Sequence, residues 1–200
     1  MDNNRLTQRF REMAESIILS WLEPEPIVFK REHEVAARRV VAVIHRADAD
    51  EAAELRSPVN RNGFLLGCLD YTDERTEEHL IIGYGFRHSS TTKIERVHHV
   101  VGSLDSASIP TEIAKAVMDH YEAHDDNEVI LFHNHPRWWA NLFFDNSPLA
   151  SPADRNVLAR TASSPEQFLR TFAGGGRVLF FLGEYGRVKP FRLPPILRLL

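Results

Sequence analysis

The residues with the clearest chemical potential are two histidines in the stretch His133-Asn134-His135-Pro136. They follow an apolar run, Glu128–His133, that predicts a strand buried on both faces. Residues two apart in a strand share a face, so the two imidazoles can take adjacent positions on a tetrahedral metal ion. Pro136 ends the strand there. We therefore expect the pair at an edge of the sheet, where a pocket can form.

A second polar group follows in Ser151-Pro152-Ala153-Asp154, which predicts the start of a helix with Ser151 as its N-cap. The carboxylate of Asp154 would complete a set of two histidines and one carboxylate, with one metal position left for water. Bound zinc lowers the pKa of such a water towards ~7. The Ser151 hydroxyl would lie close enough to donate to a developing oxyanion. Helix capping alone also explains both residues.

Helices and strands must position these residues. Strands are predicted where short apolar or β-branched runs are bounded by turns, at 39–45, 64–71, 80–86, 93–101, 128–133, 177–182 and 187–191. Helices are predicted at 5–21, 48–56, 110–124, from 151 onward and near 165–172. Turns and loops are predicted at 57–63, 73–78, 103–109 and 136–150. This order predicts an α/β (α+β) fold with a mixed, mostly antiparallel central sheet flanked by helices.

The combination of His133-Asn134-His135-Pro136 and Ser151-x-x-Asp154 resembles the JAMM signature of the JAB/MPN metallopeptidases, in the form of their RadC-like bacterial branch. The similarity extends upstream through 102–113 and covers roughly residues 75–192. It implies a cytidine-deaminase-like JAB/MPN fold over residues 61–200. Residues 1–60 would form an N-terminal extension with a helix and a strand, and no helix–hairpin–helix segment is evident there.

The resemblance also implies a site. Zinc would be held by His133, His135 and Asp154, with Ser151 beside it. The family's general base is a glutamate upstream of the histidines, and Glu78 is chosen because Glu78-His79-Leu80 resembles the branch's glutamate before a strand. Glu77 is the nearest alternative, and both glutamates could instead be a solvated pair in a charged run. The predicted strand at Gly63–Gly67 has no preceding carboxylate, so it cannot supply the base.

The spacing of the motif departs from the family's usual pattern. Eighteen residues, Pro136–Ala153, separate the second histidine from Asp154, which is longer than usual. The added length is an aromatic insertion at 137–150, which is either a lid or partner-binding lip or a cluster packed against the body. Asp145 is the competing carboxylate, and the Ser151-x-x-Asp154 spacing favours Asp154. The aromatic residues that would grip a substrate are Trp138, Trp139, Phe143 and Phe144.

The implied activity is zinc-dependent cleavage of a peptide or isopeptide bond, with the tail of a ubiquitin-like protein as one candidate substrate. The alternative function is a non-catalytic RadC-like interaction module or a DNA-repair-associated accessory protein. A net charge of −4 argues against a strongly basic nucleic-acid surface. A zinc deaminase would need a Pro-Cys-x-x-Cys arm, which a chain with one cysteine cannot provide.

Composition and the remaining motifs complete the expectations. One cysteine, Cys68, fits a reducing compartment, and its apolar surroundings predict a buried, inert thiol. No apolar run approaches ~18 residues, so no membrane span is expected. Without an apolar signal core at residues 1–5, the sequence predicts a cytoplasmic protein. His120 and His124 share a helix face, where favourable charge near the helix end explains them better than metal binding. His98 and His99 are expected on opposite strand faces.

Overall fold

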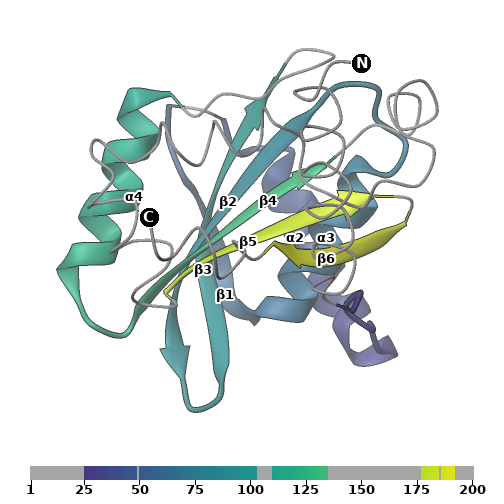
Figure 1. The fold of residues 1–200 in the computed structure, drawn as a ribbon, viewed down its shortest axis with the longest axis horizontal. Helices are drawn as coiled ribbons and strands as arrows, with labels where there is room; N and C mark the ends of the chain where they lie inside the picture. The colour runs from purple at the N-terminus through teal and green to yellow at the C-terminus, as the bar shows by residue number, and fades with distance from the viewer. Residues whose placement is uncertain (1–24, 49, 103–109, 135–176, 185, 192–200) are drawn as a thin grey trace, which may run out of the picture.

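The computed structural model describes residues 25–48, 50–102, 110–134, 177–184 and 186–191. Predictions for the remaining residues, including the helices at 5–21, from 151 and near 165–172, fall outside this part of the chain. The described residues form a six-stranded sheet in the order β1-β3-β2-β4-β5-β6 (Figure 1). Its strands are β1 Ala53–Asn60, β2 His79–His88, β3 Thr91–Val101, β4 Asn127–Asn134, β5 Val178–Glu184 and β6 Arg187–Phe191.

Helices cover both faces of this sheet. α2 (Glu34–Ile44) follows a 3-10 turn, η1 (Arg31–His33), and lies beside α3 (Arg61–Thr72) on one face. α4 (Thr111–Ala123) lies on the other face (Figure 1). None of the helices in the described ranges is long and apolar enough to cross a membrane.

Two apolar cores lie on opposite sides of the sheet. The first, between the sheet and helices α2 and α3, includes Val40, Phe64, Ile81 and Phe132. The second, between the sheet and α4, includes Leu80, Ile113, Val117 and Leu131. Consecutive residues along β2, and likewise along β4, contribute to different cores, because successive side chains of a strand point to opposite faces. The described residues before 60 therefore share a core with those after it, while the 1–60 and 61–200 division stays a prediction.

The predicted fold class is confirmed at the level of a mixed sheet flanked by helices. Four of the five strand pairings are antiparallel, and β4–β5 is parallel. Predictions that the structure confirms are the strands at 80–86, 93–101, 128–133, 177–182 and 187–191 and the helix at 110–124. Pro110 is the N-cap of that helix and does not occupy its first turn.

The strand predicted at 39–45 is wrong, because these residues belong to α2. Its buried residues are Ala36, Ala37, Val40, Val43 and Ile44. This spacing marks one face of a helix, with the two alanines lying before the β-branched run. The run by itself looks like a strand because valine and isoleucine favour strands locally.

The strand predicted at 64–71, which overlaps Gly63–Gly67, is also wrong, because all of these residues lie in α3. Asn60 caps this helix, since its Oδ1 accepts a hydrogen bond from the Gly63 backbone N at 2.7 Å. Two glycines let α3 approach α2 closely. A Cβ on Gly63 would lie 2.5 Å from the Ala36 Cβ, and one on Gly67 would lie 2.7 Å from the Val40 Cβ. Dense packing against α2, combined with this cap, stabilises a helix where the local apolar pattern suggests a strand.

The predictions of a helix at 48–56 and of a turn-rich break at 57–63 are wrong, because Ala53–Asn60 form β1. Asp48 begins a turn in place of a helix, because its Oδ1 accepts from the backbone N of Asp50 and Glu51 at 2.9 and 2.8 Å. β1 then continues through Pro58 to Asn60. It is an edge strand whose register with β3 shifts between Glu54 and Val59, which is where a proline is tolerated.

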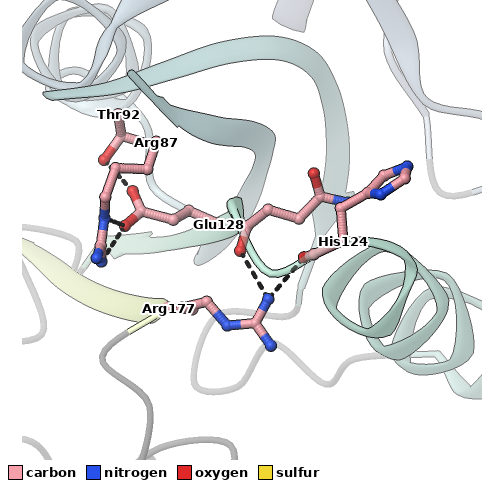
Figure 2. Close-up of polar contacts among 6 residues, drawn as sticks. Arg87, Thr92, His124, Glu128 and Arg177 are labelled. Carbon is pink, nitrogen blue, oxygen red and sulfur yellow. Dashed lines mark hydrogen bonds and ion pairs between the residues drawn. The ribbon is translucent and has the colours of Figure 1, made fainter. Parts of the chain in front are cut away.

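Polar contacts fix the first half of β4 (Figure 2). The buried Glu128 carboxylate accepts from Arg87 Nε and Nη2 at 2.8 and 2.6 Å, and from the Thr92 hydroxyl. Arg177 Nη1 donates to the carbonyls of His124 and Asn127 at 2.8 and 3.4 Å. These hydrogen bonds tie β4 to strands β2 and β3, to the C-terminal end of α4 and to the start of β5. These contacts help to hold the register that sets its far end opposite the start of β2.

Candidate functional site

The candidate site lies where β4 ends and β2 begins. The two strands are antiparallel, and Leu80 pairs with His133 in their register. Glu78, two residues before Leu80, therefore comes close to His133. Its Oε2 lies 3.7 Å from His133 Nε2, and the two residues are only 4% and 5% exposed. A carboxylate and an imidazole predicted from separate parts of the sequence thus meet at one buried point.

The face on which they meet is the one that α4 covers. Leu131, two residues before His133, and Leu80 both belong to the core under α4. By the alternation of a strand, His133 shares that face. Glu78 must share it too, because its carboxylate reaches the imidazole. The adjacent residues His79 and Asn134 are directed away from this face.

The backbone around Glu78 is held by three hydrogen bonds. Asn134 Oδ1 accepts from the His79 backbone N at 2.6 Å, and Asn134 Nδ2 donates to the Glu77 carbonyl at 3.3 Å. The Gly102 backbone N donates to the Glu78 carbonyl at 2.8 Å. The sequence motif singles out Asn134 only as the residue between two histidines. Its contacts depend on the β2–β4 register, which the sequence does not specify.

The two candidate bases have different environments. Glu78 is buried beside His133, whereas Glu77 is half-buried. The pKa of the Glu77 carboxyl is lowered, first by a hydrogen bond from its own backbone and then by one from Thr76. This is the environment expected of a solvated member of a charged run. The side chain of Glu78, by contrast, is buried in the interior.

Several predicted site residues lie outside the described part of the chain. They are His135, Ser151, Asp154, the competing Asp145 and the aromatic residues Trp138, Trp139, Phe143 and Phe144. Within the described ranges, no group of three or more histidine, cysteine, aspartate or glutamate side chains is arranged to hold a metal ion. His133 is the one predicted zinc ligand in those ranges. Its neighbour there is the carboxylate of Glu78, the predicted general base.

A pair of histidines that the sequence pattern does not predict lies on the opposite face. His79 and His99 stack with their ring centroids 5.1 Å apart, and His79 Nδ1 lies 2.9 Å from His99 Nε2. The Tyr71 ring packs edge-on against both. Burial lowers the pKa of each imidazole to about 4. Their inward direction follows from alternation with Ile81 and Val97, but their pairing depends on the hairpin register.

Two further histidines, His98 and His120, join neighbouring elements of secondary structure. His98 Nδ1 lies 2.7 Å from the Tyr84 hydroxyl on the α4 side, so His98 and His99 occupy opposite faces as predicted. The Nε2–H of His120 donates to the Gly85 carbonyl at 2.8 Å, which joins α4 to β2. Burial lowers the pKa of His120. The predicted role of His120 as a helix-end cation is therefore replaced by a hydrogen bond to the sheet.

Cys68 lies fully buried in α3, and burial raises the pKa of its thiol well above the ordinary value. The predicted burial of this thiol is confirmed, although the element around it is a helix.

Comparison of the chain with protein-family models, with curated proteins and with solved structures gives no match. The resemblance to the JAB/MPN metallopeptidases therefore rests on this chain's own residues.

Proposed function

We propose that this protein is a zinc-dependent hydrolase that cleaves a peptide or isopeptide bond, and that its fold is of the cytidine-deaminase-like JAB/MPN type. The observation that supports this most is the 3.7 Å separation of the buried Glu78 carboxylate and the His133 imidazole. Neither residue is near the other in sequence. The register of β2 and β4 brings them together, and the proposed site gives this proximity a chemical use. We further propose a cytoplasmic location, since the one cysteine fits a reducing compartment.

The residues that would hold zinc are His133, His135 and Asp154. Two imidazoles and a carboxylate are a common ligand set for a catalytic zinc ion with one open position. When bound, zinc would supply a water molecule that loses a proton near neutral pH. Of these ligands, His133 lies in the described part of the chain, and the carboxylate of Glu78, the proposed base, lies 3.7 Å from its imidazole.

In this proposal Glu78 transfers protons and Ser151 stabilises negative charge. Glu78 would take a proton from the attacking water and later deliver it to the departing amine. Burial keeps bulk water from competing for that proton, and the hydrogen bonds at Glu77, Glu78 and His79 limit the movement of the carboxylate. The Ser151 hydroxyl would donate to the oxygen that gains negative charge in the transition state.

Zinc content is the direct test of this proposal. The purified protein should carry about one zinc ion per chain, as expected for a single catalytic site. His135→Ala should lose it, as measured by elemental analysis after gel filtration. His124→Ala is the matched control, because this exposed histidine lies at the end of α4 and is not part of the proposed ligand set. Zinc lost from His124→Ala and kept by His135→Ala, or wild-type protein that binds no zinc, would contradict the proposal.

A further inference from the structure

Asn134 is buried, with 3% exposure, and its side-chain amide bridges the backbone on both sides of Glu78. We infer that Asn134 is a positioning residue that holds the Glu78 carboxylate in its place beside His133. The inference rests on the proposed function, in which Glu78 is the general base.

The geometry explains how one amide can fix one carboxylate. Asn134 Nδ2 donates to the Glu77 carbonyl at 3.3 Å, and this carbonyl lies in the peptide plane before the Glu78 Cα. Asn134 Oδ1 accepts from the His79 N–H at 2.6 Å, and this N–H lies in the peptide plane after it. Because the peptide planes are rigid, holding both of them fixes φ and ψ of Glu78. The direction of its Cα–Cβ bond is then fixed too.

Two other contacts strengthen this arrangement. The Glu78 carbonyl accepts from the Gly102 backbone N at 2.8 Å, which ties the same peptide plane to the end of β3. The His79 ring stacks on His99 and packs against Tyr71 on the opposite face. Residue 79 is therefore held by both its backbone and its side chain. Glu78 lies next to it with its side chain on the other face.

The residue type is informative as well. The bridge needs a donor and an acceptor at the end of one short side chain, which asparagine provides. A carboxylate at this position would accept from His79 but could not donate to Glu77. His133 and Asn134 are also adjacent on β4, so one strand presents the imidazole to one face and the Asn134 amide to the other. We call the two hydrogen bonds from this amide to the backbone around Glu78 the clamp. A shift of β4 would therefore move the imidazole and the clamp together.

Amide hydrogen exchange tests the clamp without any assay of activity. In Asn134→Ala we expect the His79 amide to exchange about tenfold faster than in wild type, because its buried acceptor is gone. Asn134→Ser keeps a small polar group and provides a second variant if alanine does not fold. The matched control is Asn127→Ala. It removes a hydrogen bond from Asn127 Nδ2 to the His120 carbonyl, 2.7 Å, at the other end of β4.

Steady-state kinetics then test the positioning role, with a ubiquitin conjugate whose C-terminal amide releases a fluorophore as the probe. Asn134→Ala should lower kcat by about 10- to 100-fold with KM nearly unchanged, because a misplaced base slows chemistry and leaves binding intact. Asn127→Ala should retain wild-type kcat. In a Glu78→Gln background the Asn134 substitution should have no further effect on the residual rate, because the base it positions is already absent.

The outcomes separate the inference from the function on which it rests. Unchanged exchange at His79 in both Asn134 variants would show that the clamp does not exist. Faster exchange with unchanged kcat, or equal losses in Asn127→Ala, would reduce Asn134 to a structural residue and overturn the inference. Wild-type protein that carries zinc but hydrolyses neither this probe nor a quenched fluorescent peptide library would count against the proposed function. Exchange at His79 would still show whether the clamp is present.

Discussion

Glu78 is an unusual residue because a carboxylate that is 4% exposed has lost most of its hydration. An ionised carboxylate in such a place costs several kcal/mol unless a partner or hydrogen bonds compensate. Its neighbour here is the imidazole of His133, which is itself buried. A surface location in the adjoining charged run would avoid this cost. In the proposed function this position has a use, because a general base must lie within hydrogen-bond reach of the proton that it takes.

Glu78→Gln is the prediction at the residue scale. The substitution keeps the size of the side chain but removes its ability to accept a proton. We expect zinc content to stay at the wild-type level and kcat to fall about 10²- to 10⁴-fold. Fluorophore release from the ubiquitin conjugate measures kcat, and elemental analysis measures zinc. Glu77→Gln is the control and should retain wild-type activity. Activity that survives in Glu78→Gln but disappears in Glu77→Gln would move the base to the adjacent residue.

At this scale, the sequence gives candidate residues but not their contacts. The resemblance selects Glu78 and His133 separately, and the structure brings their side chains together. Their roles stay predictions. The His79–His99 pair is not foreseen, because the contact requires the β2–β3 register in which His79 pairs with Val101 and Ile81 with His99. Register is set by the hairpin and by packing, and no single residue type encodes it.

At the scale of elements, the close contact of α2 and α3 determines one side of the molecule. Gly67 faces the backbone and side chain of α2, where an added Cβ would lie 2.8 Å from the Ala37 carbonyl oxygen and 2.7 Å from the Val40 Cβ. The nearest atoms belong to a backbone carbonyl and to a stiff β-branched side chain. Neither can move aside without a shift of the helix.

Gly67→Ala should therefore destabilise the protein, although alanine usually stabilises a helix by up to about 1 kcal/mol relative to glycine. Forced separation of the two helices should exceed this gain and leave a net loss of about 1–3 kcal/mol. Urea denaturation followed by circular dichroism measures the free energy of unfolding. Asp70→Ala, at an exposed position of the same helix, is the matched control and should cause no loss. Greater stability of Gly67→Ala would contradict the packing of α2 on α3.

The elements that can be predicted from sequence are those whose pattern agrees with their final burial. β2, β4 and α4 have apolar residues at the spacing that the fold requires. α2 and α3 are misassigned because a short window of valines, or of phenylalanine and leucines, favours a strand locally. Their buried alanines and glycines, and the Asn60 cap, carry the opposite signal. β1 is missed because Pro58 looks like a break, whereas an edge strand tolerates it.

For the molecule as a whole, the layered arrangement buries histidines on both sides of the sheet. His79 and His99 lie between the sheet and α3, and burial lowers the pKa of each to about 4. In the unfolded chain these groups would titrate near 6.5. Below that pH the unfolded state binds protons that the folded state does not take up until about pH 4. Acid therefore favours unfolding across this window.

The free energy of unfolding should be insensitive to these two histidines above about pH 6.5 and should fall between pH 6.5 and 4. Each such group adds a slope of up to ~1.4 kcal/mol per pH unit. Urea denaturation at a series of pH values measures the profile. His99→Phe keeps an aromatic ring against Tyr71 and should make the profile flatter, whereas the exposed His88→Ala should leave it unchanged. An identical fall in His99→Phe would assign the acid sensitivity to other groups.

The parallel pairing of β4 with β5 has a consequence for how this protein can vary. The chain leaves β4 at Asn134 and enters β5 at Val178, which pairs with Val129 near the other end of β4. Because the two strands are parallel, the chain between them must return along the length of the sheet, which takes about a dozen residues or more. The pairing therefore sets a lower bound on how short this connection can become. The eighteen residues Pro136–Ala153 lie within the connection, so the proposed insertion before Asp154 is compatible with that bound.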